Sequence, residues 1–190
     1  MSHFVIRPGQ TEYDAQSRIS GHLSLPLTNQ GHREIGEIID SLKDVPLDAI
    51  YTAGTEQSLS TAIAVADALD CDIKVVEALT NMNLGLWQGL RVDDLRTRQP
   101  RVFKLWQDCP DAVCPPLGET CEDVFERIAT ALRKPLRRGK HFAVVAGEPL
   151  ATIVEGVLRG DRNIQKAGPL CRSASKTWVQ ITRVEIPVAV

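Results

Sequence analysis

Short apolar runs alternate along this chain with longer segments whose apolar residues recur at helical spacing. The strand-like runs are residues 3–7, 49–52, 73–76, 141–146 and 178–184. Apolar residues recur at i, i+3, i+4 and i+7 within segments 35–42, 62–69, 121–132 and 150–158. Strands that alternate with helices favour a mainly parallel sheet with helices on both faces. The sequence therefore predicts an α/β fold with three layers, α/β/α, around a mainly parallel central sheet.

The length of the chain favours one domain. Its 190 residues, 43% of them hydrophobic and 24% charged, are enough for one well-filled core. We expect residues 1–190 to form a single domain, because no repeat, low-complexity tract or interdomain linker interrupts them. Arg101 to Leu117 contains three prolines, and we expect residues 101–117 to form a flap or lobe over the sheet edge.

The charge and apolar patterning exclude several classes of partner. A net charge of -2 supplies no positive field for a nucleic acid. The basic run from Arg133 to Lys140 suits a solvated helix end, where cations face the negative end of the helix dipole. No segment approaches the roughly 20 apolar residues of a membrane span, and the first residues lack a signal-peptide pattern. We expect a cytoplasmic protein that binds neither nucleic acid nor membrane.

The five cysteines are odd in number and irregular in spacing. Cys109, Cys114 and Cys121 lack the spacing and nearby histidines of common zinc sites. We expect no metal, no cofactor and reduced, mostly buried thiols.

The turns after the strands are where a site would form. In open α/β sheets, ligands bind beyond the carboxyl ends of the parallel strands. The turns that follow Ile6, Tyr51 and Val145 are therefore the positions to inspect.

These turns carry a resemblance to a known family. The stretches involved are 7–11, 18–31, 51–62, 79–90, 116–120 and 144–160. In order and spacing they resemble the histidine phosphatase superfamily, the phosphoglycerate mutase-like proteins. That family opens with Arg-His-Gly-Glu-Thr, and this chain has Arg7-Pro8-Gly9-Gln10-Thr11. The resemblance implies the fold already predicted and a phosphoryl-transfer site at the strand ends.

The same resemblance implies that four catalytic positions are altered. Pro8 stands where the nucleophilic histidine belongs, and its amide nitrogen has no lone pair for attack. Gln57 replaces a phosphate-binding arginine, Asn81 replaces the acid, and Gly147 replaces a second histidine. Loss of one member of a cooperating catalytic set costs about 10⁴ to 10⁶ in rate. We therefore expect no ordinary route to a phosphohistidine.

Residues for binding an anion or another ligand are only partly retained. Arg7 matches the family's first phosphate-binding arginine, and Ser20 and Gly21 lie in the matching loop. Glu148 stands at a usual glycine and Asp14 at a usual asparagine, so both add negative charge to the pocket. Two interpretations of Arg7 stay open: it binds a phosphate or carboxylate, or it pairs internally with Asp14 or Glu148.

Three functional hypotheses follow. The first is a catalytically inactive pseudophosphatase that acts by binding a partner protein or a small ligand. The alternative is a phosphomonoesterase or phosphoglycerate mutase-like hydrolase with a rearranged site. The third is a structural subunit that forms a homo-oligomer or pairs with an active relative.

Overall fold

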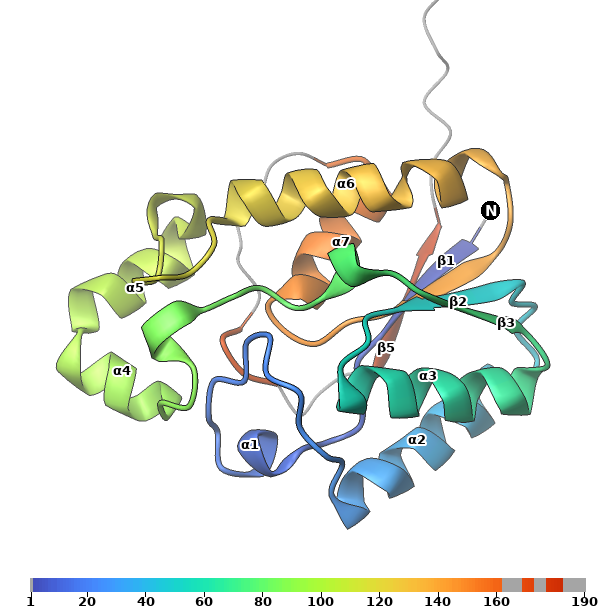
Figure 1. Cartoon of the computed structure of the whole chain (residues 1–190), viewed down its shortest axis with the longest axis horizontal. Coiled ribbons are helices and arrows are strands. Elements are labelled where there is room, and N and C mark those ends of the chain that lie inside the picture. Colours follow the sequence, from blue (N-terminus) through green and yellow to red (C-terminus); the bar gives the residue numbers. More distant parts are fainter. Residues whose placement is uncertain (1, 162–168, 173–176, 183–190) are drawn as a thin grey trace, which may run out of the picture.

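A five-stranded, mainly parallel sheet forms the centre of the molecule. The computed structural model describes residues 2–161, 169–172 and 177–182 (Figure 1). The strands are β1 (Ser2–Ile6), β2 (Ala49–Thr52), β3 (Asp72–Val75), β4 (Phe142–Val145) and β5 (Trp178–Thr182). Their order in the sheet is β3-β2-β4-β1-β5. Strands β1 to β4 pair in parallel, whereas β5 runs antiparallel to β1. The predicted fold class is confirmed.

Two pairs of helices cover the sheet. Figure 1 shows α2 (Asn29–Leu42) and α3 (Glu56–Leu69) on one face, and α6 (Cys121–Arg137) and α7 (Leu150–Arg159) on the other. Successive side chains of a strand point to opposite faces. Accordingly, Phe4 and Ile6 pack in the cluster under α2 and α3, while Val5 packs in the cluster under α6 and α7. Both faces of the sheet are therefore buried, as a parallel sheet requires.

The structure moves several predicted boundaries. Strand β3 begins one residue earlier than predicted, β4 is two residues shorter, and β5 ends at Thr182. Positions 183–184 of that last prediction lie outside the described residues. The polar stretch before Thr28, for which no element was predicted, contains the short helix α1 (Glu12–Ala15). Thr11 and Asp14 form a capping box that satisfies the first N–H groups of α1 and explains this helix.

The segment between β3 and α6 is helical rather than extended. It contains η1 (Glu77–Leu79), η2 (Gly85–Trp87), α4 (Val92–Arg98), α5 (Pro100–Asp108) and η3 (Pro110–Ala112). Figure 1 shows α4 and α5 at the end of the molecule opposite β3. Trp106 of α5 meets the ring of Trp87 edge-on, with centroids 5.8 Å apart, and both rings are buried. These tryptophans serve packing and anchor residues 101–117 to the main core.

The cysteine prediction was partly wrong. Cys121 is buried, but Cys71 and Cys171 are half-buried, and Cys109 and Cys114 are exposed. Cys109 and Cys114 flank the short η3 turn, in which Asp111 and Ala112 are also exposed. Among the described helices, none combines the length and the apolar character of a membrane span.

Candidate active site

The turns after β1, β2 and β4 meet at one edge of the sheet and enclose a small cavity of about 30 Å³. That volume is enough for one or two water molecules. The cavity is lined by Arg7, Pro8, Gly9, Thr11, Asp14, Ser20, Thr55, Gln57, Ser58, Asn81, Gly147, Glu148 and Arg172. The structure thus brings together every sequence-predicted site residue except Gly21.

Arg7 directly follows β1, and two carboxylates hold its guanidinium group. Its Nη2 lies 2.6 Å from Oε1 of Glu148 and 3.1 Å from Oε1 of Glu155. Its Nε donates a further hydrogen bond of 2.7 Å to Glu148. Only Nη1 lacks a hydrogen-bond partner among the described residues. Of the two partners considered from the sequence, Glu148 pairs with Arg7, and Asp14 does not.

Glu148 is the most buried charged group of the site. Its side chain is 2% exposed, and Oε2 accepts a hydrogen bond of 3.0 Å from the hydroxyl of Thr152. It lies between β4 and α7, just before the cis peptide bond to Pro149. The Arg7–Pro8 peptide is trans, since Glu148–Pro149 is the one cis bond among the described residues. A buried carboxylate is stable only when paired and hydrogen-bonded, and Glu148 is both.

The amide side chains of Asn81 and Gln57 hold loops in place. Asn81 Nδ2 donates to the main-chain oxygen of Glu148, and its Oδ1 accepts from the N–H groups of Met82 and Leu150. Gln57 holds the loop at residues 23–25, where it donates to the carbonyl of Leu23 and accepts from the N–H of Leu25. Both amides therefore use their donor and acceptor internally.

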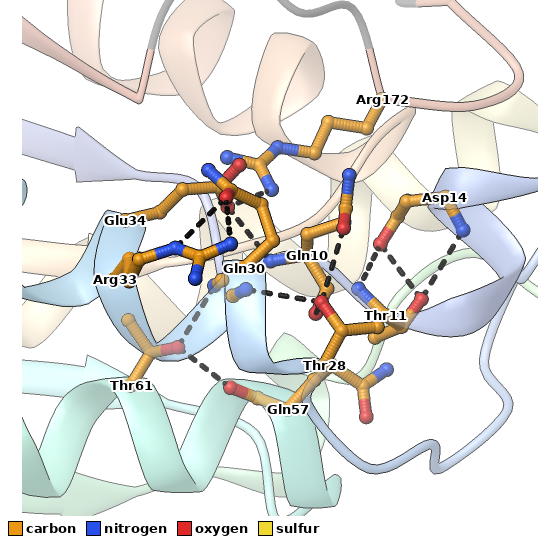
Figure 2. A network of polar contacts seen from close by, with 12 residues as sticks. Gln10, Thr11, Asp14, Thr28, Gln30, Arg33, Glu34, Gln57, Thr61 and Arg172 are labelled. Carbon is orange, nitrogen blue, oxygen red and sulfur yellow. Dashed lines mark hydrogen bonds and ion pairs between the residues drawn. The ribbon is translucent and has the colours of Figure 1, made fainter.

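The loop after Pro8 is held by a polar network (Figure 2). The N–H of Gly9 donates to the hydroxyl of Thr61, and the N–H of Gln10 donates to Glu34. Figure 2 shows Glu34 between this loop and Arg172, whose Nη1 lies 2.5 Å from Glu34 Oε2. The second arginine of the cavity is therefore neutralised in the same way as the first.

The remaining predicted residues have local roles. Asp14 accepts hydrogen bonds from the main chain and the hydroxyl of Thr11. Ser20 lines the cavity. Gly21 lies outside it and has a φ of +53°, where a Cβ would collide with the side chain of Gln88. The turn thus favours glycine at position 21, and the structure gives it no place in the pocket.

Glu155, Thr152 and Arg172 were missed from the sequence. Glu148, Thr152 and Glu155 are spaced i, i+4 and i+7, which is the signature of one helix face and could have revealed two of them. Arg172 has no comparable signal, because it lies far along the chain from every other residue of the cavity.

The lining contains neither histidine nor cysteine among the described residues. Burial raises the pKa of the Cys171 thiol, and the charges of Asp14 and Asp93 raise it further. A thiol with a raised pKa is a poor nucleophile. The described residues also contain no group of three or more histidines, cysteines or carboxylates that could hold a metal ion.

A comparison with models of protein families shows to which family this chain belongs. The model of the histidine phosphatase superfamily (branch 1) matches residues 3–186. The chain belongs to this superfamily.

Similar proteins include enzymes with phosphatase and mutase names. A bifunctional protein of Mycobacterium tuberculosis is 30% identical over 152 residues, which are 79% of this chain and 39% of that protein. The chain therefore spans about two fifths of that relative. Phosphoserine phosphatase 1 of Hydrogenobacter thermophilus is 23% identical, over 74% of this chain and 67% of its own. A probable phosphoglycerate mutase of Escherichia coli is 25% identical, over 82% of this chain and 74% of its own.

The fold is also that of solved superfamily structures. A mycobacterial glucosyl-3-phosphoglycerate phosphatase, in complex with VO3, superposes with a TM-score of 0.76 at 22% identity. The match covers 84% of this chain and 82% of that one. At this identity the likeness shows the fold alone.

The geometry of the cavity limits its chemistry. A free guanidinium group binds a phosphoryl group through paired N–H donors. In this chain Arg7 and Arg172 each donate to a carboxylate, and the charge of Glu148 offsets that of Arg7. As arranged, the cavity is an internally neutralised polar site.

Proposed function

We propose that this chain is a non-catalytic member of the histidine phosphatase superfamily, which acts by binding a partner protein or a small ligand. The observation that carries the proposal is the state of Arg7. Two carboxylates, Glu148 and Glu155, occupy the guanidinium group that would otherwise receive the phosphoryl oxygens. Together they offset the positive charge of Arg7, so the site offers an incoming phosphate little electrostatic attraction.

The absence of a nucleophile supports the same conclusion. Pro8 occupies the position at the end of β1 where the family resemblance places the nucleophilic histidine. An amide nitrogen cannot form a phosphohistidine-like intermediate. No histidine or cysteine of the described part of the chain lines the cavity to replace it.

The competing function is a phosphomonoesterase or mutase with a rearranged site. The enzyme names of the relatives favour it. It needs a nucleophile or an activated water, together with an arginine free to bind the phosphate. The salt bridges of Arg7 oppose that requirement.

Hydrolysis of an aryl phosphate by the purified protein tests the proposal. The assay compares the wild type with Arg7→Lys from acid to neutral pH, and rapid acid quenching traps any phosphorylated protein. We expect no turnover above that of the variant and no phosphoprotein. Turnover that survives purification and is lost in the variant would overturn the proposal.

A restored variant gives the positive control. Pro8→His, Gln57→Arg, Asn81→Glu, Gly147→His and Glu148→Gly together return the family's residues. Because Glu148→Gly also removes the closer and more buried of the two carboxylates that hold Arg7, we expect this variant to gain measurable hydrolysis and a trappable phosphohistidine. The gain would show that the fold still supports the chemistry and that the wild type lacks only these groups.

A further inference from the structure

Helix α6 lies along one side of the molecule in Figure 1 and carries a groove. One hollow of about 490 Å³ lies over its N-terminal half, and a second of about 270 Å³ lies between its C-terminal half and the end of α7. Phe125, Ala129 and Arg133 line both hollows, so the two form one continuous groove. Phe125 and Leu136 are half-buried and leave apolar surface in it. The groove is a surface of the kind on which helices pack.

The charges that line this groove are separated by sign. Glu122 and Glu126 lie on the N-terminal half of α6, and Arg133 and Arg137 lie on the C-terminal half. All four side chains are exposed, and none forms an ion pair with a described residue. The two acids are spaced i, i+4, and so are the two bases. Like charges at this spacing destabilise a helix, so within one copy the pattern is unfavourable.

The dipole of α6 explains only the outer two of these charges. A helix dipole favours acids in the first turn and bases in the last turn, and its effect fades beyond them. Glu122 lies in the first turn and Arg137 in the last. Glu126 and Arg133 lie outside both turns, where the dipole does not account for them. The order of two acids followed by two bases is, however, complementary to itself when a second helix runs in the opposite direction.

We propose that a second copy of this chain packs its α6 antiparallel in this groove, with the two-fold axis between Ala129 and Thr130. Glu122 then faces Arg137 of the second copy, and Glu126 faces Arg133 of the second copy. The symmetry repeats both contacts, so all four charges of each helix are paired. The small side chains at the axis let the two helices approach closely. The apolar surface of the groove is covered in the same contact, and the charges fix the direction of the partner.

Other arrangements of the two helices pair fewer charges. Parallel helices in register set each acid against the same acid and each base against the same base. An antiparallel pair that slides by one turn in one direction keeps only the contact between Glu126 and Arg137 of the second copy. A slide in the other direction keeps only the contact between Glu122 and Arg133 of the second copy. Only the register centred between residues 129 and 130 pairs every charge.

Cross-linking at the axis tests the contact directly. Thr130 is exposed, and Thr130→Cys places one thiol of each copy beside the axis. A short bis-maleimide is added to an equal mixture of isotope-labelled and unlabelled protein, and linked peptides are identified by mass. We expect links between residue 130 of a labelled copy and residue 130 of an unlabelled copy. Glu37→Cys, an exposed position on α2, is the matched control, and we expect about tenfold fewer links there.

Charge variants test the pairing rule. One variant carries Arg133→Glu and Arg137→Glu, so its groove is acidic throughout; the other carries Glu122→Arg and Glu126→Arg, so its groove is basic throughout. We expect each variant alone, with its fold checked by circular dichroism, to self-associate through α6 about tenfold more weakly or worse. An equal mixture of the two variants restores the contact, because every acid then faces a base. In each case Thr130→Cys reports the contact by the same cross-link.

Three results would overturn the proposal. They are links at residue 130 no more frequent than at the control position, links that the charge variants form as readily as the wild type, and a mixture that stays unlinked. The first result would mean that the groove has another occupant, such as an amphipathic helix of a different protein. The cross-link reads this contact whatever other contacts the chain makes, and it does not depend on hydrolysis. Its outcome is therefore separate from that of the proposed function.

Discussion

Replacing Arg7 by alanine should destabilise the fold strongly, even though Arg7 lies in a site that we propose to be inactive. The substitution removes both close contacts to Glu148, whose side chain is 2% exposed. The buried carboxylate then keeps only the hydroxyl of Thr152 as a side-chain partner. Breaking a buried ion pair by removing one partner costs about 3–5 kcal/mol, because the remaining charge is uncompensated.

The contact between Arg7 and Glu155 adds little to this cost. Glu155 is 19% exposed and lies 3.8 Å from Arg159, so it keeps solvent and a second cation. Such partly exposed pairs contribute about 0–1 kcal/mol. We therefore expect a total loss of about 3–5 kcal/mol, which for a chain of this size lowers the Tm by roughly 6–20 °C.

Urea unfolding followed by circular dichroism measures this loss at neutral pH. Arg96→Ala is a matched control, because Arg96 pairs with Asp93 at the surface, where the side chains are 64% and 78% exposed. We expect the control to lose at most about 1 kcal/mol. The double variant Arg7→Ala with Glu148→Gln removes the uncompensated charge and should recover more than half of the loss.

Two results would refute this reasoning. If Arg7→Ala unfolds within about 1 kcal/mol of the control, the buried pair does not hold the site together. If the double variant is no more stable than Arg7→Ala, the cost does not come from the buried charge of Glu148.

Further predictions concern the packing of α2 and the thiols. Gly31→Ala should lower the free energy of unfolding by about 1–3 kcal/mol or more, because a Cβ at Gly31 would collide with the backbone of Gln10. Gly36 lies on the same helix with open space around it, so Gly36→Ala should raise the free energy of unfolding by up to about 1 kcal/mol. Urea unfolding measures both changes. Burial, with smaller contributions from neighbouring groups, raises the pKa of Cys121 to about 12, so at pH 8 only about 10⁻⁴ of it is thiolate. Iodoacetamide followed by peptide mass analysis should therefore label the exposed Cys109 and Cys114 and spare Cys121 until the chain unfolds.

The layers of the fold were predictable because the spacing of apolar residues along the sequence indicates which side of each helix or strand is buried. The alternation of short apolar runs with helical stripes predicted the sheet and its covering helices, and the structure confirms both. Helix α1 escaped prediction because its four residues are too few to show a helical stripe, and a local capping box stabilises them. The antiparallel direction of β5 also escaped, since an apolar run carries no sign of its direction.

The sequence predicted the residues of the site that lie in the turns after the strands. It did not predict the ion pairs that these residues form with residues far away in the sequence. Pro8, Gln57, Asn81, Gly147 and Glu148 all line the cavity because parallel strands bring their turns to one edge. The choice between the two partners of Arg7 needed coordinates, since both acids were equally compatible with the sequence. The salt bridge between Arg172 and Glu34 joins residues 138 positions apart, a pairing that no local pattern encodes.

The buried ion pair also constrains the order in which such a site can change. While a carboxylate occupies position 148, loss of Arg7 exposes the chain to the full penalty of an unpaired buried charge. The arginine is then retained by selection on folding, whether or not any ligand requires it. The substitution Pro8→His alone would leave Arg7 paired with Glu148 and Glu155. If the site is inactive, as we propose, a gain of catalysis would also require a change at position 148, beyond the replacement of the residue that should act as nucleophile.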